Sequence, residues 1–136
     1  NVGISRQFSI FELTRDLSVK NASKALRTAA YIGSAAKFAM PMAVSALYSH
    51  FYKILKYGAL LMRNQNPPND QKAKVLGVSP YFFKEYDAAV RNYPPKKAMA
   101  VIALLREYDF KGKGGNVGEA TPSELMVELT AKILNI

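Results

Sequence analysis

The spacing of side chains in this sequence of 136 residues offers little for catalysis or for metal binding. The absence of cysteine excludes disulfides and thiolate metal sites, and the one histidine, His50, cannot alone form a transition-metal site. Glu107 and Asp109 lie two residues apart on a predicted helix and therefore on different faces. With Arg106 and Lys111 beside them, they predict a charge cluster at a helix end rather than an acid–base pair.

His50 falls beside the apolar stripe of a predicted helix, with serine and lysine among its neighbours. We expect this imidazole to be partly buried and hydrogen-bonded, in a structural role. No partner for a catalytic triad presents itself nearby. We therefore predict no catalytic residue, metal site, cofactor or small-molecule substrate, and this part of the protein is not expected to be an enzyme.

The glycine-rich segment 111–118, KGKGGNVG, invites comparison with phosphate-binding loops. A P-loop follows a strand and ends in Gly-Lys-Ser/Thr at a helix start, whereas this segment follows a predicted helix and has neither glycine spacing. The main interpretation is a flexible connection between helices. The alternative is contact with a nucleic-acid phosphate, for which the candidate residues are Lys111, Lys113 and Asn116.

Residues 70–93, DQKAKVLGVSPYFFKEYDAAVRNY, have the pattern of a helix-turn-helix in a basic chain. A helix that reads DNA exposes Arg, Asn, Gln, Ser or Lys at its N-terminal positions, which here are Tyr81, Phe82 and Phe83. These aromatic side chains are expected to pack, partly under the preceding helix and partly against a partner. Lys84 and Arg91 could reach phosphates, but phosphate contacts carry no base sequence information.

The formal net charge is +9, which favours an acidic partner such as nucleic acid, an acidic protein or an anionic membrane. Between Leu17 and Asn69 there are seven basic residues and no acidic one, so this half is expected to present a positive surface. Two interpretations stay open for it: a solubilising face, or attraction to phosphates or to an acidic neighbouring subunit.

The start of the chain resembles no signal peptide, and the missing initiator Met predicts a piece of a longer protein. The most apolar stretch, residues 38–62, carries His50, Lys53 and Lys56 near its middle, where charges would be costly in a bilayer. No membrane association is expected. The lack of cysteine fits a reducing compartment, so a cytoplasmic location is expected.

Helix start and stop signals predict an all-α fold, a single bundle of six to seven helices over residues 1–136. Ser9 with Glu12 makes a capping box for a helix from about Ile10 to Ser18. Later boundaries rest on proline, glycine and capping residues. The further helices are expected from Asn21 to about Gly33, from Pro41 past Met62, up to Leu76, from Ser79-Pro80, from Pro94-Pro95 to Gly112, and from Thr121.

Four segments in this order resemble the C-terminal region of the delta subunit of bacterial DNA polymerase III, a clamp-loader subunit: GISRQFSIFEL, ALYSHFYKILKY, AKVLGVSPYFFKEYDAAVRNY and IALLREYDFKGKG. The resemblance implies a helical collar domain that follows two AAA+-type domains, which would precede this chain. It also implies a non-catalytic scaffold role in the clamp loader that places the sliding clamp on primed DNA. The implied partners are the gamma/tau and delta-prime type subunits, with at most weak contact to nucleic acid.

Aromatic residues are numerous for a core of this size, with 8 Tyr and 7 Phe. Candidate subunit contacts are Tyr52 and Tyr57, which lie off the predicted apolar stripe of their helix, together with Tyr81 and Phe82.

The alternative function to a collar domain is that of a basic helix-turn-helix DNA-binding protein. It predicts tight, base-selective binding to duplex DNA, whereas a collar domain predicts weak binding that ignores base sequence.

Overall fold

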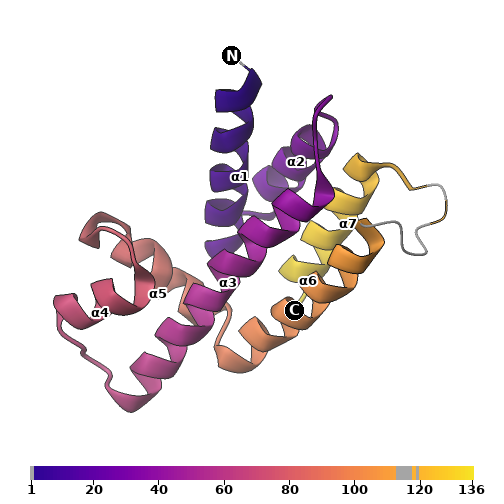
Figure 1. The fold of residues 1–136 in the computed structure, drawn as a ribbon. Helices are drawn as coiled ribbons and strands as arrows, with labels where there is room; N and C mark the ends of the chain where they lie inside the picture. Colours follow the sequence, from indigo (N-terminus) through magenta and orange to yellow (C-terminus); the bar gives the residue numbers. More distant parts are fainter. Residues whose placement is uncertain (1, 113–117, 119) are drawn as a thin grey trace.

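The computed structural model describes residues 2–112, 118 and 120–136, and it describes side chains from residue 10 onward within these ranges. Within this part of the chain there are seven α-helices, one short 3-10 turn and no strand, which confirms the predicted all-α fold (Figure 1). The elements are α1 (Val2–Ser18), α2 (Ala22–Gly33), α3 (Met40–Arg63), α4 (Asn69–Leu76), η1 (Pro80–Phe82), α5 (Phe83–Asn92), α6 (Pro95–Gly112) and α7 (Pro122–Leu134).

Local capping chemistry explains why most of these helices begin and end where they do. The Asn21 side chain accepts a hydrogen bond from the Lys24 backbone N–H at 3.4 Å and so caps α2. Thr121 and Glu124 form a reciprocal capping box at the start of α7, with distances of 3.0 and 3.1 Å. Gly77 ends α4 in the left-handed conformation, at φ 65°. All three predicted caps are confirmed.

The predicted start of the first helix is wrong. α1 begins at Val2, so Ser9 lies inside the helix and is not its N-cap. The segment 4–9, ISRQFS, contains neither glycine nor proline, and no residue in it strongly opposes helix continuation. A capping-box pattern therefore does not start a helix where the preceding residues can extend it.

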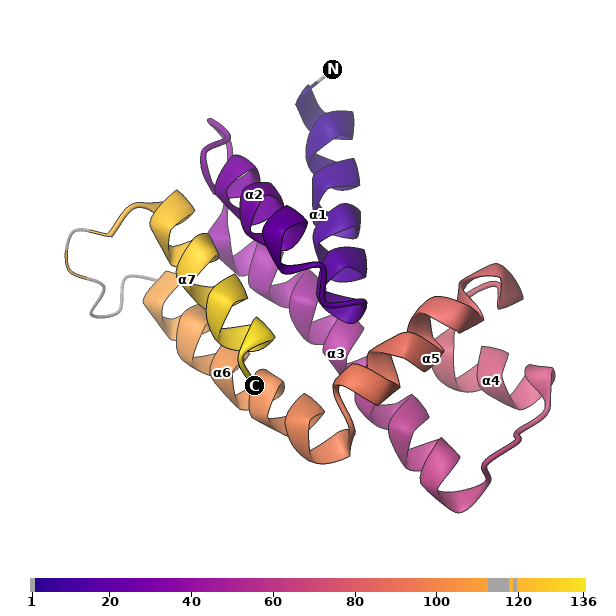
Figure 2. The ribbon, with the colours of Figure 1, turned by 180° about the vertical axis from the view of Figure 1, so that it is seen from behind.

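The helices pack around α3, which crosses the middle of the molecule (Figures 1 and 2). α3 runs antiparallel to α6, α2 packs against α1 and α7, and α5 packs against α1 and α3. Apolar side chains from these helices make one continuous core. Its largest fully buried members are Tyr57, Tyr93, Tyr108, Phe51, Leu13, Leu17, Leu47, Ile54, Leu76, Leu105, Met126 and Leu129.

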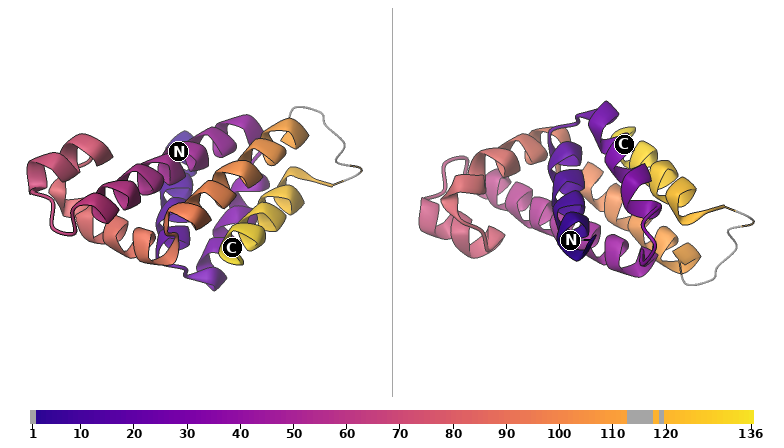
Figure 3. Two further views of the ribbon diagram at one scale, coloured as in Figure 1. Left: turned by 90° about the horizontal axis from the view of Figure 1, so that it is seen from below. Right: turned by 90° about the horizontal axis from the view of Figure 1, so that it is seen from above.

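α4, η1 and α5 (residues 69–92, called the α4–α5 arm below) lie at one end of the molecule. Figures 1 and 3 show α4 and the turn that follows it at the end opposite to α7. α4 and α5 both pack against the C-terminal half of the molecule's central helix, α3, rather than forming a separate unit. The arm is therefore anchored to the bundle while the turn between α4 and α5 faces outward.

A buried polar cluster joins three helices through His50 of α3. Its Nε2 lies 2.6 Å from Ser18 Oγ of α1, and its Nδ1 lies 3.4 Å from the Tyr86 hydroxyl of α5. The Ser18 hydroxyl lies 2.8 Å from the Thr14 carbonyl, to which it donates its proton, so we assign the imidazole proton to Nε2, which donates to Ser18. Nδ1 then accepts from Tyr86, and the network fits the neutral imidazole. His50 is hydrogen-bonded as expected and is only 7% exposed.

Acid should destabilise the fold through His50. Burial, with a smaller contribution from the Lys53 charge, lowers the pKa of His50 from 6.5 to about 4. Below pH 6.5 the unfolded chain takes up this proton and the folded chain does not, so stability falls as the pH drops from 6.5 towards 4. We expect the free energy of unfolding to fall by about 2 kcal/mol between pH 7 and pH 5 in urea titrations. The His50→Gln variant should lose most of this pH dependence. An equal slope of the free energy of unfolding against pH in both proteins would contradict the assignment of this effect to His50.

Candidate protein-interaction surface

The turn between α4 and α5 holds two aromatic side chains in solvent. Gly77 reverses the chain after α4, Pro80 begins η1, and Ser79 Oγ accepts from the Tyr81 backbone N–H at 3.3 Å. Tyr81 is 85% and Phe82 45% exposed. Their rings lie 5.1 Å apart at an interplanar angle of 85°, an edge-to-face arrangement that fixes each ring against the other.

Phe83, the next residue, shows the opposite behaviour. It is buried, and the Lys72 ammonium lies 5.8 Å from the centre of its ring. The sequence predicts that the three aromatics pack partly under the preceding helix and partly against a partner. In the structure Phe83 is inside and the Tyr81–Phe82 pair is at the surface, and contact of this pair with a partner stays a prediction.

The exposed charges of the α4–α5 arm are mostly basic. The arm has three exposed basic residues but only one exposed acidic residue, Asp70. Its other two carboxylates are half-buried. Asp87 accepts a hydrogen bond from Tyr57, and burial raises the pKa of Glu85. The aromatic pair thus stands on a surface of positive character that would suit an acidic partner surface. The exposed basic residues are Lys74, Lys84 and Arg91.

Tyr52 lies on a different element, α3, and is 44% exposed. Its ring stacks on that of Tyr48, one helical turn earlier, with centroids 6.1 Å apart and planes 9° apart. The Lys56 ammonium lies over the other end of this stack, 5.1 Å from the Tyr52 ring. Tyr52 is accessible, so it stays a candidate contact, on a helix separate from the Tyr81–Phe82 pair.

The prediction that Tyr57 is a subunit contact is wrong. Tyr57 is fully buried, and its hydroxyl donates to Asp87 Oδ1 at 2.5 Å. Burial and this hydrogen bond raise the pKa of Tyr57 well above its usual value. The predicted apolar stripe of α3 was too narrow: α6 covers one side of the helix while α4 and α5 cover another. His50, Ile54 and Tyr57 lie on that second buried side.

Because Tyr57 is a core residue, Tyr57→Phe should act on stability and not on partner binding. The variant leaves the half-buried Asp87 carboxylate without its hydroxyl donor, which should lower the free energy of unfolding by about 1–2 kcal/mol. Urea titration measures this loss. Unchanged stability together with weakened partner binding would return Tyr57 to the list of contacts.

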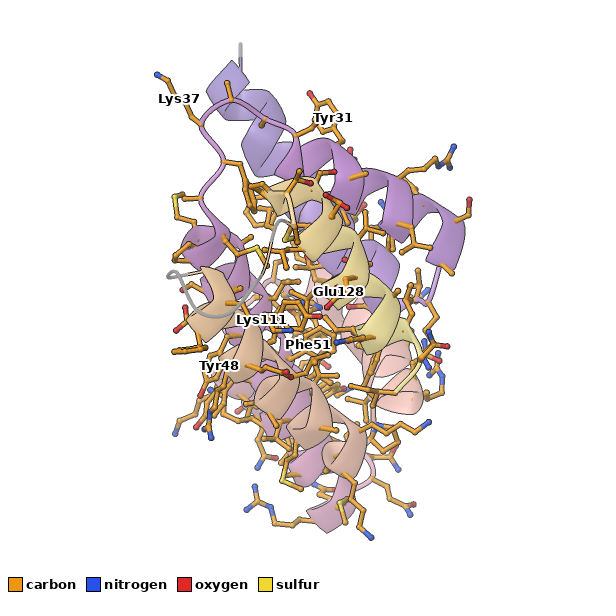
Figure 4. All side chains as sticks on the ribbon, turned by 90° about the vertical axis from the view of Figure 1, so that its right-hand side faces the viewer. Tyr31, Lys37, Tyr48, Phe51, Lys111 and Glu128 are labelled. Carbon is orange, nitrogen blue, oxygen red and sulfur yellow. The ribbon has the colours of Figure 1, made fainter. Side chains whose placement is uncertain are left out.

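Two of the three candidate DNA contacts, Lys113 and Asn116, lie outside the described residues. The third, Lys111, is half-buried between acidic groups, with its Nζ 3.8 Å from Glu107 and 3.9 Å from Glu128 (Figure 4). It also lies 4.5 Å from the centre of the Tyr108 ring, whose hydroxyl donates to Glu128. The charge of Lys111 is compensated within the molecule in this arrangement, and its contact with DNA stays a prediction.

Several further exposed apolar side chains were not predicted. Met62 lies four residues after the buried Gly58, a spacing that predicts burial, yet it is 76% exposed in the last turn of α3. Phe110 could have been found from helical spacing, because it follows the buried Tyr108 by two residues and so must face away from the core. The remaining exposed large apolar residues are Phe11, Val19, Tyr31, Met42 and Met99.

Neither a metal centre nor a membrane span is visible in the part of the chain that the structure describes. No group of three or more His, Asp and Glu side chains there is placed to hold a metal ion. None of the described helices combines the length and the apolarity that crossing a bilayer requires. Comparisons with protein-family models, with curated proteins and with solved structures gave no significant match. The resemblance to the clamp-loader delta subunit therefore rests on the sequence segments alone.

Proposed function

We propose that this chain is a non-catalytic interaction domain that serves as a collar domain of a clamp loader, in the manner of the C-terminal region of the delta subunit of bacterial DNA polymerase III. In this role it would hold the loader together while other domains bind ATP and the sliding clamp. Its partners would be the gamma/tau and delta-prime type subunits. The location would be the cytoplasm, where replication takes place in bacteria.

The observation that carries the proposal is the exposed Tyr81–Phe82 pair. Large aromatic side chains are enriched at the centres of protein interfaces, where they supply apolar area at a small cost in conformational entropy. Here both rings project from a turn that Gly77, Ser79 and Pro80 fix in place. Because this aromatic pair is already held in place, it needs little reordering to enter a pocket of another subunit.

The same geometry argues against the alternative, a helix-turn-helix that reads DNA bases. The residues in η1 and at the start of α5, where a recognition helix would carry its reading side chains, are Tyr81, Phe82 and the buried Phe83. The exposed cations Lys84 and Arg91 could neutralise phosphates but would not distinguish base pairs. Any DNA binding by this domain is expected to be salt-sensitive and independent of base sequence.

The test is a pair of titrations of the wild-type chain. In one, the gamma/tau and delta-prime type subunits from the same organism are immobilised and binding is followed by biolayer interferometry. In the other, labelled duplex DNA is titrated at low and moderate salt. We expect binding to at least one subunit, and DNA binding that weakens steeply with salt. Base-selective DNA binding without subunit binding would establish the alternative, and binding to neither would also overturn the proposal.

A further inference from the structure

A groove between α3 and α6 forms a second accessible surface, on a different part of the molecule from the Tyr81–Phe82 pair. Gly58 of α3 lies against Pro95 of α6, and the N-terminal half of α3 lies beside the C-terminal half of α6, so the two helices are antiparallel (Figure 3). Between these halves lies an open cavity of about 390 Å³. Its lining includes Val44, Ser45 and Tyr48 from α3 and Leu105, Arg106 and Asp109 from α6.

The groove continues as an apolar surface along both helices. On α3, the stacked Tyr48 and Tyr52 rings extend the wall by one turn. On α6, Met99 and Phe110 lie seven residues before and four residues after Arg106, which places all three on one face of the helix. Met99 is 52% and Phe110 66% exposed. The floor itself is closed, with Val44 4% and Leu105 0% exposed, so the accessible apolar surface comes from the large side chains at the edges.

Two cations and one carboxylate lie at the edges of this apolar surface. α3 contains three basic residues and no Asp or Glu among its 24 residues. Lys56 is held over Tyr52 at 5.1 Å, and Arg106 lines the opposite wall and is exposed. One carboxylate, Asp109, also lines the groove. Two cations on the rim against one carboxylate favour an occupant that brings negative charge.

We propose that this groove is the docking site of an amphipathic helix rich in Asp and Glu, supplied by a partner protein. The stretch of α3 from Pro41 to Tyr52 is about 17 Å long, which matches about three turns of a bound helix. Apolar side chains at positions i, i+3 or i+4, and i+7 of that helix would lie against the stacked Tyr48 and Tyr52 rings on one side and Phe110 on the other. Its flanking carboxylates would meet Arg106, which can form two parallel hydrogen bonds, and Lys56.

Two other occupants fit this surface less well. A second copy of this chain would bring one net charge of +9 against another, which opposes association. Nucleic acid would match the positive charge, but Arg106 is the single cation in the lining of the groove, whereas a nucleic-acid backbone is bound through several phosphate contacts. The inference does not depend on the clamp-loader proposal, because it concerns a different surface and names only the chemistry of the partner.

The test uses the wild-type chain and labelled peptides of about 18 residues that form an amphipathic helix. One peptide carries leucine on one face and glutamate on the rest; the second carries lysine in place of every glutamate. We expect fluorescence anisotropy to show at least about tenfold tighter binding of the acidic peptide. Nuclear magnetic resonance should place the largest shift changes at Tyr48, Tyr52 and Arg106.

Substitutions in the groove test where on the molecule the acidic peptide binds. Ser45→Trp should fill the groove and Arg106→Glu should reverse its charge, and each should weaken binding of the acidic peptide about tenfold. Ser23→Trp and Arg27→Glu make the same changes at exposed positions of α2 and should leave binding within about twofold. Circular dichroism checks that all four variants fold. Equal binding of both peptides, no effect of Ser45→Trp, or saturable binding of duplex DNA or of a second copy at this groove would each overturn the proposal.

Discussion

Replacing Tyr81 and Phe82 together by alanine should weaken binding to the clamp-loader subunits at least about 100-fold, or about 2.7 kcal/mol. Tyr81 is 85% and Phe82 45% exposed in the free domain, and neither belongs to the buried core, so their removal leaves that core in place. The thermal unfolding midpoint should therefore stay close to that of the wild type. Biolayer interferometry against the immobilised subunits measures the first quantity, and differential scanning calorimetry measures the second.

The matched control for this variant is the double replacement Phe11→Ala and Tyr31→Ala. It removes the same two residue types from exposed positions on α1 and α2, where Phe11 is 67% and Tyr31 58% exposed. It should leave binding within about threefold of the wild type. A loss of the same size in both double variants would mean that exposed aromatic surface in general, and not the Tyr81–Phe82 pair, drives the association.

Gly33→Ala should cost about 3 kcal/mol of stability or more. Gly33 is the last residue of α2 and touches the first turn of α7. A Cβ at this position would lie 2.5 Å from Ser123 Cα, 2.8 Å from Ser123 N and 2.9 Å from the Pro122 carbonyl oxygen. These are backbone atoms, so no side chain can rotate away and the two helices must separate. Separation would also strain the bond that Ser123 Oγ donates to the Ala30 carbonyl at 3.0 Å.

Gly58→Ala provides the comparison for this prediction. There the added Cβ would approach the Pro95 side chain at 3.2 and 3.3 Å, a contact that small shifts can relieve. Gly58 also lies inside α3, where alanine regains up to about 1 kcal/mol of helix propensity. Urea titration should therefore show a change within about 1 kcal/mol for Gly58→Ala. Similar losses for the two variants would contradict the close approach of α2 and α7 at Gly33.

Sequence signals were sufficient wherever a local rule decides the structure. The caps at Asn21 and Thr121, the αL end at Gly77 and the start of α3 at Pro41 depend on residues within a few positions of each other. On α6 the apolar residues recur at helical spacing and are buried, because one side of that helix faces the core throughout: Ala98, Val101, Ile102, Leu105 and Tyr108. These features determine the all-α fold without knowledge of distant contacts.

Features that depend on packing between distant segments could not be predicted in the same way. Periodicity along α3 shows one buried stripe, but only the positions of α4 and α5 reveal that Tyr57 is buried as well. The partners of His50 lie 32 and 36 residues away, on α1 and α5. The groove beside Tyr48 exists because α6 returns antiparallel to α3, an arrangement that no local pattern specifies.

The most direct test of the collar-domain account is native mass spectrometry of the wild-type chain mixed with the gamma/tau and delta-prime type subunits of the same organism. The account predicts a complex whose mass exceeds that of the other subunits alone by one copy of this chain, 15.0 kDa. The same mixture with the Tyr81→Ala and Phe82→Ala variant should lack this species. A spectrum in which the wild-type chain stays free, while the other subunits assemble without it, would contradict the account.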